Sequence, residues 1–358
     1  MPDFTSALYL GLRHPTQALR PWSRLTAGVP SALREPAEAV GTARRLAALI
    51  GCESAVLGSS TLHLFWDLPA LLAGRSVVLV EQGTYAIGRG GAQRAAAAGA
   101  RVAEFAHHNP RALHRALLAL APGRRSLIVI DSVAPGEDGR SPLPAYAELA
   151  KRFGALLVID DTQALGILGA KPDRRLPYGY GGGGSLRHHG LRGGHLVVIA
   201  SLGKALGVPL AVLAGSSTEV ARFSAGSETR THSSPPSTPA LRAAERALSV
   251  NRAQGDARRA RLHRLVQQLR AGLFELGLAP TGDELPVQAL PAVPLQMLAK
   301  LQPEVERRGL IAVPQRLSPR RGRLSLLINA RHTQRDIADA LTALEGAYIS
   351  CALSEQAA

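Results

Sequence analysis

Short, continuously apolar runs that alternate with helix-like stretches constrain the fold of this chain more than any other feature of its sequence. The runs SLIVID (126–131), ALLVID (155–160) and HLVVIA (195–200) are rich in valine, isoleucine and leucine along their length. Two further runs, 76–80 and 101–105, extend the pattern. Strands that are buried on both faces have such continuously apolar sequences, because the helices between them cover both sides of a parallel sheet. The sequence therefore predicts an α/β fold around a mostly parallel central sheet.

The chain changes character twice, and these changes predict its domains. Four prolines interrupt the first 35 residues, which predicts an N-terminal arm without a long helix. A Ser-Ser-Pro-Pro sequence at 233–236 precedes a long arginine-rich helical stretch, about 239–278, and then a smaller α/β pattern. We expect an arm (1–35), a large domain (36–235) and a small C-terminal α/β domain (236–358).

Charge and composition exclude several classes of function. The 358 residues carry a net charge of +15, but the basic residues are scattered and aromatic residues make up 4%, too few for a base-stacking surface. No apolar run reaches the ~18 residues of a membrane span. The first residues, MPDFTSALYL, lack the features of a signal peptide. With two cysteines, the chain is expected in the reducing cytoplasm, without nucleic acid or membrane as partner.

Two reactive side chains stand where strands of this sheet should end. Asp160 closes one apolar run, and Lys204 follows another among glycine and apolar residues. Ligands of an open parallel sheet bind at the carboxyl ends of its strands. Pyridoxal phosphate (PLP) requires a lysine amine and a carboxylate beside its ring nitrogen. Taken singly, Asp160 could be a helix cap and Lys204 a surface lysine, but together they favour a PLP site.

Four short motifs resemble the α-oxoamine synthase family of PLP enzymes. YLGL (9–12) resembles an N-terminal family segment, and DDTQALG (160–166) resembles D-E-A-H-x-x-G. SLGKALG (201–207) resembles T-x-x-K-A-x-G, and ARHT (330–333) resembles the A-x-H-T that opens the last helix. The resemblance implies an aspartate-aminotransferase-like fold (PLP fold type I) and a homodimer with its sites at the subunit interface.

The resemblance also implies roles for the matching residues. Lys204 would form the Schiff base with PLP and later move the substrate α-proton, and Asp160 would pair with the pyridine nitrogen. Gln163 stands where the family has a histidine at the ring 3-hydroxyl, and glutamine donates a hydrogen bond but does not titrate near neutral pH. Ser201 would reach the phosphate, and Ser234 would reach the phosphate held by the partner subunit.

Further matches have a structural alternative beside the functional one. Ser60 and Thr61 precede a helix, where they would bind the phosphate or simply act as N-caps. Tyr85 takes the ring-stacking position, with Thr84 as the other choice of register. Ser132 would lie near the ring or satisfy main-chain groups at a strand end.

The chain departs from the family pattern where the substrate carboxylate should bind. Counting back seven residues from His332 gives Ser325 in place of the usual arginine. Arg323 shares a strand face with Ser325, so both are candidate substrate-binding residues. The glycine-rich stretch 178–194 lengthens the spacing between the two main motifs, and it is interpreted either as a floppy surface loop or as a lid or pocket loop.

The function implied by the resemblance is that of a PLP-dependent acyltransferase. Such an enzyme condenses an amino acid with an acyl thioester of coenzyme A or a carrier protein, and decarboxylation leaves an α-aminoketone. The changed residues keep open an aminotransferase or another PLP-dependent enzyme that forms C–C or C–N bonds. A non-catalytic partner subunit is the alternative from another class.

Two groups of residues outside these motifs have simpler interpretations. The pairs His107–His108 and His188–His189 lack a cysteine or carboxylate pattern beside them, so no metal site is predicted. Four arginines lie along a predicted helix, which favours a solvated face, with a contact to an acidic carrier protein as the alternative: Arg258, Arg259, Arg261 and Arg264.

Overall fold

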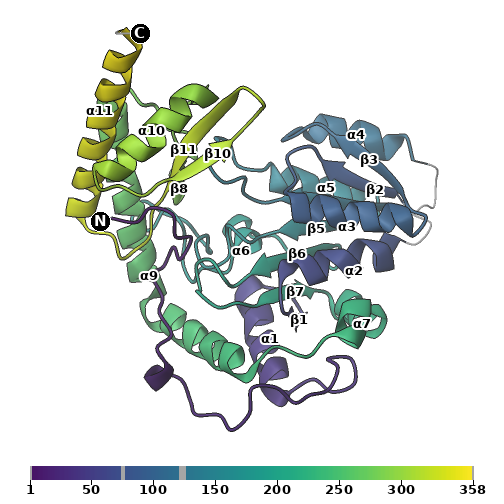
Figure 1. Ribbon diagram of the computed structural model, residues 1–358. Helices are drawn as coiled ribbons and strands as arrows, with labels where there is room; N and C mark the ends of the chain where they lie inside the picture. The colour runs from purple at the N-terminus through teal and green to yellow at the C-terminus, as the bar shows by residue number, and fades with distance from the viewer. Residues whose placement is uncertain (1, 74–76, 121–125, 357–358) are drawn as a thin grey trace. The chain divides into compact units, whose positions relative to one another are not determined.

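The computed structural model describes residues 2–73, 77–120 and 126–356 (Figure 1). The chain forms two compact units, the larger made of residues 12–134 and 140–256 and the smaller of residues 1–11, 135–139 and 257–358. The division expected from the sequence, at 35/36 and 235/236, stays a prediction. None of the described helices is long and apolar enough to cross a bilayer.

A seven-stranded sheet lies at the centre of the larger unit and confirms the predicted α/β fold. Its spatial order is β1-β7-β6-β5-β4-β2-β3, with parallel pairing from β6 through to β3. β7 runs antiparallel to both of its neighbours. All five predicted runs are strands here, with described ends within one residue of the prediction, although Ser76 lies outside the described residues. The strands are β1 (Ser54–Gly58), β2 (Val77–Glu81), β3 (Arg101–Phe105), β4 (Ser126–Asp131), β5 (Leu156–Asp160), β6 (Leu196–Ser201) and β7 (Ala211–Gly215).

Helices cover this sheet, and α2 and α3 lie together over one of its faces (Figure 1). Leu64 and Phe65 of α2 and Phe223 of α7 are buried in one apolar cluster with alternate residues of the central strands. Between residues 2 and 35 the only described helix is a 3-10 helix, Thr16–Ala18, as the prolines predict. The helices of this unit are α1 (Ala37–Ile50), α2 (Thr61–Ala73), α3 (Ala86–Ala97), α4 (Pro110–Leu118), α5 (Leu143–Arg152), α6 (Ser185–His189), α7 (Ser217–Gly226) and α8 (Glu228–His232).

The glycine-rich stretch 178–194 is packed into the larger unit, which contradicts its interpretation as a floppy loop. Ala170 and Tyr180 form an antiparallel bridge between this stretch and the segment after β5. Residues 182–186 are buried. Repeated main-chain hydrogen bonds along this contact offset the entropic cost of ordering so much glycine.

The smaller unit contains an antiparallel sheet in which β11 (Arg321–Leu327) pairs with the other three strands. The long helix α9 (Thr238–Glu275) runs through both units, with residues 257–275 in this one. The helical stretch predicted at about 239–278 corresponds to α9, and the last helix, expected to open at the 330–333 motif, is α11, so the small α/β pattern is confirmed. The remaining elements are β8 (Val287–Ala289), β9 (Val293–Pro294), β10 (Val313–Arg316), α10 (Leu295–Arg307) and α11 (Gln334–Gln356).

The arginines of α9 form the predicted solvated face only in part: Arg261 and Arg264 are exposed, whereas Arg258 is half-buried. Arg259 is fully buried, so the prediction is wrong for this residue. Arg258 donates a hydrogen bond to the Leu10 carbonyl at 3.0 Å, and Arg261 donates to the Ala330 carbonyl at 2.8 Å. Main-chain carbonyls of distant segments therefore hold these guanidinium groups, and helical spacing contains no information about such contacts.

Candidate functional site

Asp160 and Lys204 lie at the same edge of the large sheet. Asp160 is the last residue of β5, and Lys204 follows the end of β6 in a tight turn. Because β5 and β6 are neighbouring parallel strands, their carboxyl ends lie side by side. The turn is closed by the Leu202 N–H, which donates to the Leu210 carbonyl at 2.8 Å. The strand-end placement expected for the two residues is therefore present.

Burial and mutual attraction act in opposite directions on this pair. Burial raises the pKa of the Asp160 carboxyl, although hydrogen bonds from Thr162 and the nearby charge of Lys204 partly oppose the shift. Burial also lowers the pKa of the Lys204 amine, against the attraction of Asp160. A lowered pKa leaves more of the lysine as the neutral, nucleophilic amine. The buried carboxylate would gain from a second cationic partner such as a protonated ring nitrogen.

A chain of hydrogen bonds connects the two strand ends. The Thr162 N–H donates to Asp160 Oδ1 at 3.0 Å. The Ser201 N–H donates to Thr162 Oγ1 at 3.1 Å, and the Gly203 N–H donates to Ser201 Oγ at 3.1 Å. Gln163, the next residue after Thr162, is half-buried. Sequence reasoning missed Thr162, although an aspartate that accepts from the N–H two residues later is a recognisable Asx turn.

Ser60 and Thr61 lie where the α2 helix begins. Ser60 Oγ and His63 Nδ1 are hydrogen-bonded at 2.8 Å, and Thr61 is the first helical residue. The unpaired N–H groups of a first helical turn, together with hydroxyls, form an anion site. The same geometry is that of a capped helix, so a role in phosphate binding stays a prediction.

The two candidates for ring stacking differ in exposure. Tyr85 is 61% exposed, and its N–H donates to Asp131 Oδ2 at 3.0 Å, which fixes the start of α3. Thr84 is 4% exposed, and its hydroxyl donates to the Val129 carbonyl at 3.3 Å. Of these two residues, Tyr85 has an aromatic ring and an exposed side chain, whereas Thr84 has neither. The geometry favours Tyr85 over Thr84, and its stacking role stays a prediction.

Ser132 makes the main-chain contact that was the alternative to its functional interpretation. Its N–H and its hydroxyl both donate to the Asp160 carbonyl, at 3.0 and 3.2 Å, and the residue is 5% exposed. Ser132 therefore anchors the end of β5, and contact with a cofactor ring stays a prediction. Ser234 is exposed just after α8, and its role toward a partner subunit stays a prediction as well.

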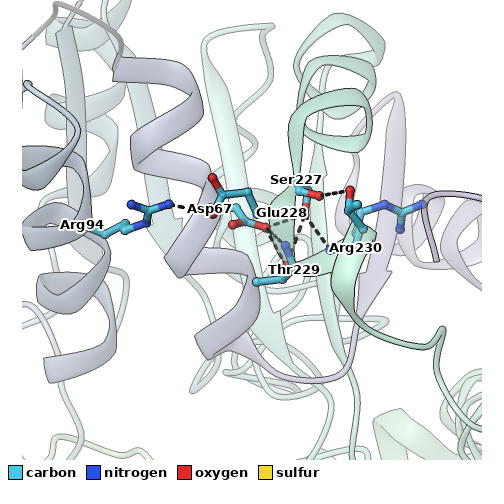
Figure 2. Close-up of polar contacts among 7 residues, drawn as sticks. Asp67, Arg94, Ser227, Glu228, Thr229 and Arg230 are labelled. Atoms are coloured by element: carbon cyan, nitrogen blue, oxygen red, sulfur yellow. Dashed lines mark hydrogen bonds and ion pairs between the residues drawn. The ribbon is translucent and has the colours of Figure 1, made fainter. Parts of the chain in front are cut away.

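A buried polar cluster attaches the segment around α8 to α2. Figure 2 shows Asp67 of α2 beside Ser227 and Thr229. Asp67 Oδ2 accepts hydrogen bonds from Ser227 Oγ (2.5 Å), Thr229 Oγ1 (2.6 Å) and the Thr229 N–H (3.0 Å). Nearby, Arg94 of α3 and Glu228 form an ion pair at 2.7 Å. The cluster thus joins the helix that starts at Thr61 to the segment that leads to Ser234, another serine predicted to reach a phosphate.

Arg323 and Ser325 lie side by side in the smaller unit. Arg323 Nε and Ser325 Oγ each donate to Gln315 Oε1 at 2.9 Å, which confirms that the two residues share a face of β11. Arg323 also donates to the Gly136 carbonyl at 3.1 Å. Burial lowers the pKa of the Arg323 guanidinium. Contact of either residue with a substrate carboxylate stays a prediction.

Comparison with known proteins identifies the family. A model of class I and II aminotransferases matches residues 41–344. The chain belongs to this family. PLP is the cofactor of these fold type I enzymes, and solved structural neighbours hold it, so the predicted cofactor is confirmed.

Curated members of the family that are similar to this chain include two 8-amino-7-oxononanoate synthases. The Nitrosococcus oceani protein is 30% identical over 252 residues, which cover 69% of this chain and 63% of that protein. The Dechloromonas aromatica protein is 32% identical over 259 residues, which cover 71% of this chain and 63% of that protein. Both are α-oxoamine synthases, which confirms the predicted resemblance. The matched part of the chain spans less than two thirds of their length.

Solved structures confirm the predicted fold type within the family. A serine palmitoyltransferase from S. paucimobilis, in complex with PLP and myriocin, superposes with a TM-score of 0.86 at 17% identity and covers 98% of this chain and 88% of that one. The 8-amino-7-oxononanoate synthase of Francisella tularensis has a TM-score of 0.75 at 16% identity and covers 97% and 98% of the two chains. At these identities the likeness concerns the fold alone.

Proposed function

We propose that this chain is a PLP-dependent acyltransferase of the α-oxoamine synthase type. The observation that carries the proposal is the placement of Asp160 and Lys204 at adjacent strand ends, joined through Thr162. The similar 8-amino-7-oxononanoate synthases support the same reaction class. The substrates would be an amino acid and an acyl thioester carried by coenzyme A or a carrier protein.

The chemistry of the donor set fits PLP. Asp160 would offer a half-buried carboxylate to the ring nitrogen, and Lys204 would offer an amine to the aldehyde carbon. Gln163 would donate a hydrogen bond to the ring 3-oxygen, and Tyr85 would cover the ring. Hydroxyls for the phosphate would come from the start of α2 and from the end of β6: Ser60, Thr61 and Ser201. When bound, PLP supplies an electron sink for the pair of electrons released at the substrate α-carbon.

Lys204 and Asp160 would divide the proton chemistry between them. Burial lowers the pKa of Lys204, so its amine can accept the α-proton of the amino acid and hold it. Asp160 stays in place through Thr162 and Ser132 and holds the ring nitrogen protonated. A bond then forms between the α-carbon and the acyl carbon as the thiol leaves. The substrate carboxyl group departs as carbon dioxide, and the α-carbon takes a proton to give an α-aminoketone.

A second candidate function follows from position 325. The family arginine is replaced by Ser325, which is fully buried and donates its hydrogen bond to Gln315. A changed grip on the substrate carboxylate favours an aminotransferase, or another PLP enzyme that forms C–C or C–N bonds. Assembly as a homodimer and a cytoplasmic location remain part of the proposal.

The cofactor assignment is tested on the purified full-length protein. We expect a visible absorption band with PLP and, after borohydride reduction and peptide mapping, a pyridoxyl group on Lys204. Lys204→Ala should lose the band, whereas the control Lys151→Ala, at an exposed position on α5, should keep it. A band that survives in Lys204→Ala, or no band with added PLP, would overturn the assignment.

The reaction class is tested by thioester dependence. Amino acids are screened with and without acyl-coenzyme A and acyl carrier protein, while free thiol and carbon dioxide are measured. Release of both, only when amino acid and thioester are present together, supports the acyltransferase. Conversion of a 2-oxo acid without thiol release would favour the aminotransferase instead.

A further inference from the structure

A second cluster of reactive side chains lies at the edge of the large sheet formed by β2 and β3. Glu81 is the last residue of β2, and His107 and His108 follow β3, its parallel neighbour. One donor atom from each of the three side chains lies within 4.8 Å of the other two. In the sheet, β4 separates these strands from β5 and Asp160. The cluster therefore lies at a different strand end from Asp160 and contains none of the predicted PLP-binding residues.

Glu81 brings a fully buried carboxylate into this cluster. Its Oε1 atom accepts hydrogen bonds from the Tyr146 hydroxyl at 2.7 Å and from the His108 N–H at 2.8 Å. Its Oε2 atom accepts no hydrogen bond from the described residues and lies 3.7 Å from His107 Nδ1. A buried carboxylate oxygen without a donor is costly. One oxygen thus holds the carboxylate in place, and the other is directed at the histidines.

The backbone is shaped so that both imidazoles sit beside Glu81. A Cβ atom at Gly83 would lie 2.1 Å from His107 Nδ1, so only glycine leaves room for this ring. His108 has φ +49°, a left-handed conformation that costs free energy in any residue with a side chain. The two rings stack with centroids 3.7 Å apart and planes at 25°. The glycine at position 83 and the left-handed conformation of His108 thus place the two rings beside Glu81.

We propose that Glu81, His107 and His108 bind one divalent cation of the first transition series, with zinc as the best match. Two imidazoles and a carboxylate form the donor set of zinc sites that keep a position for water. Zinc bonds of about 2.0–2.2 Å place tetrahedral donors about 3.4 Å apart, so small rotations of these side chains bring the donors together. The side chain of His107 is 30% exposed, while both of its ring nitrogens and Glu81 Oε2 are buried, so the ion would enter as the His107 ring rotates.

The cation would stabilise the turn between β2 and α3. The Thr84 N–H donates to the Glu81 carbonyl at 3.0 Å, so the chain turns there immediately before Tyr85. An ion held by Glu81 and by the segment after β3 would join the ends of β2 and β3 and so hold the residue from which this turn starts. The inference does not rest on the proposed acyltransferase function, because no residue of the cluster takes part in it.

The test uses cobalt(II) as a visible probe of the full-length protein, after treatment with a chelator and with its PLP content matched between samples. We expect one cobalt ion per chain with d–d absorption bands, loss of those bands on addition of zinc, and a higher thermal midpoint with zinc. His107→Gln and His108→Gln should each weaken cobalt binding by about 10-fold or more. His114→Gln, on the neighbouring helix α4, is the matched control and should bind cobalt as the parent does.

Three results would overturn the proposal. They are no binding of cobalt or zinc by the parent protein, equal affinity in His107→Gln and the parent, and equal loss in His114→Gln. Near-identical circular dichroism spectra of the variants would show that they fold. Since PLP content is measured separately, failure here leaves the acyltransferase proposal untouched.

Discussion

Asp160 and Lys204 illustrate how a half-buried carboxylate and a half-buried amine act on one another's pKa. Burial raises the pKa of Asp160 and lowers the pKa of Lys204, and the charge of each group opposes the shift of the other. Thr162 shifts this balance toward the carboxylate by donating to it. The pair therefore suits a ligand that places a cationic group beside Asp160 and an electrophilic carbon beside Lys204.

The first prediction concerns the charge of Asp160. Asp160→Asn cannot hold a ring nitrogen protonated, so it should slow exchange of the α-proton of the substrate amino acid by about 100-fold or more. The Lys204-linked absorption band should remain, because the amine is unchanged. Proton NMR in deuterated buffer measures the exchange, and absorbance measures cofactor content. Parental exchange rates at full cofactor content would rule out the assigned role.

At the scale of elements, the cluster around Asp67 holds α2 to the segment around α8. Asp67→Ala should lower the free energy of unfolding by about 3 kcal/mol, because buried donors of Ser227 and Thr229 lose their acceptor. Glu228→Ala, which breaks a more exposed ion pair, should cost less than about 1 kcal/mol. Urea unfolding followed by tryptophan fluorescence is suitable, since Trp22 and Trp66 both belong to the larger unit. Equal losses in the two variants would contradict this account.

The glycine-rich stretch allows a test in which backbone strain is matched. Gly179 and Gly181 have φ angles of +80° and +81°, so alanine at either position should cost about 1–2 kcal/mol in strain. A Cβ atom at Gly179 would lie 2.2 Å from the Gly169 carbonyl oxygen, whereas one at Gly181 would meet open space. The free energy of unfolding of Gly179→Ala should therefore be about 1–3 kcal/mol lower than that of Gly181→Ala. Similar unfolding midpoints would argue that this stretch is not packed as described.

For the whole molecule, partly or fully buried histidines make folding sensitive to acid. Burial lowers the pKa of five histidines, and that of His188 falls to about 4: His14, His188, His189, His195 and His332. The unfolded chain then binds more protons than the folded one below about pH 6.5, so this contribution to stability is complete above that pH and is lost as the pH falls toward 4. The urea midpoint should drop between pH 7 and pH 5.

His188→Gln isolates the largest of these shifts. The variant should lose less stability than the parent between pH 7 and pH 5, because one group that is neutral in the folded state no longer titrates. The buried carboxylates contribute equally to the pH dependence of stability in the variant and in the parent, so their effect cancels when the two proteins are compared. His232→Gln, at an exposed position, is the control and should follow the parent. A parental pH profile in His188→Gln would disprove the assignment to this residue.

The sequence by itself determined the sheet, the order of its main motifs and the family. Runs such as 155–160 are apolar without interruption, and that local property already requires a strand covered on both faces. A reactive residue at the end of such a run must lie at the ligand-binding edge, which is why Asp160 and Lys204 could be chosen from the sequence. Local pattern carries this information because strand and helix periods are short.

Only the tertiary structure decided which distant residues meet. The contact of Thr162 with Ser201, the burial of Arg259 and the approach of Glu81 to His107 join residues that share no local pattern. The packing of 178–194 against the segment after β5 is of the same kind. Such contacts depend on which strands become neighbours and how closely two backbones approach. Sequence spacing does not encode either quantity, because both are set only when the whole sheet has formed.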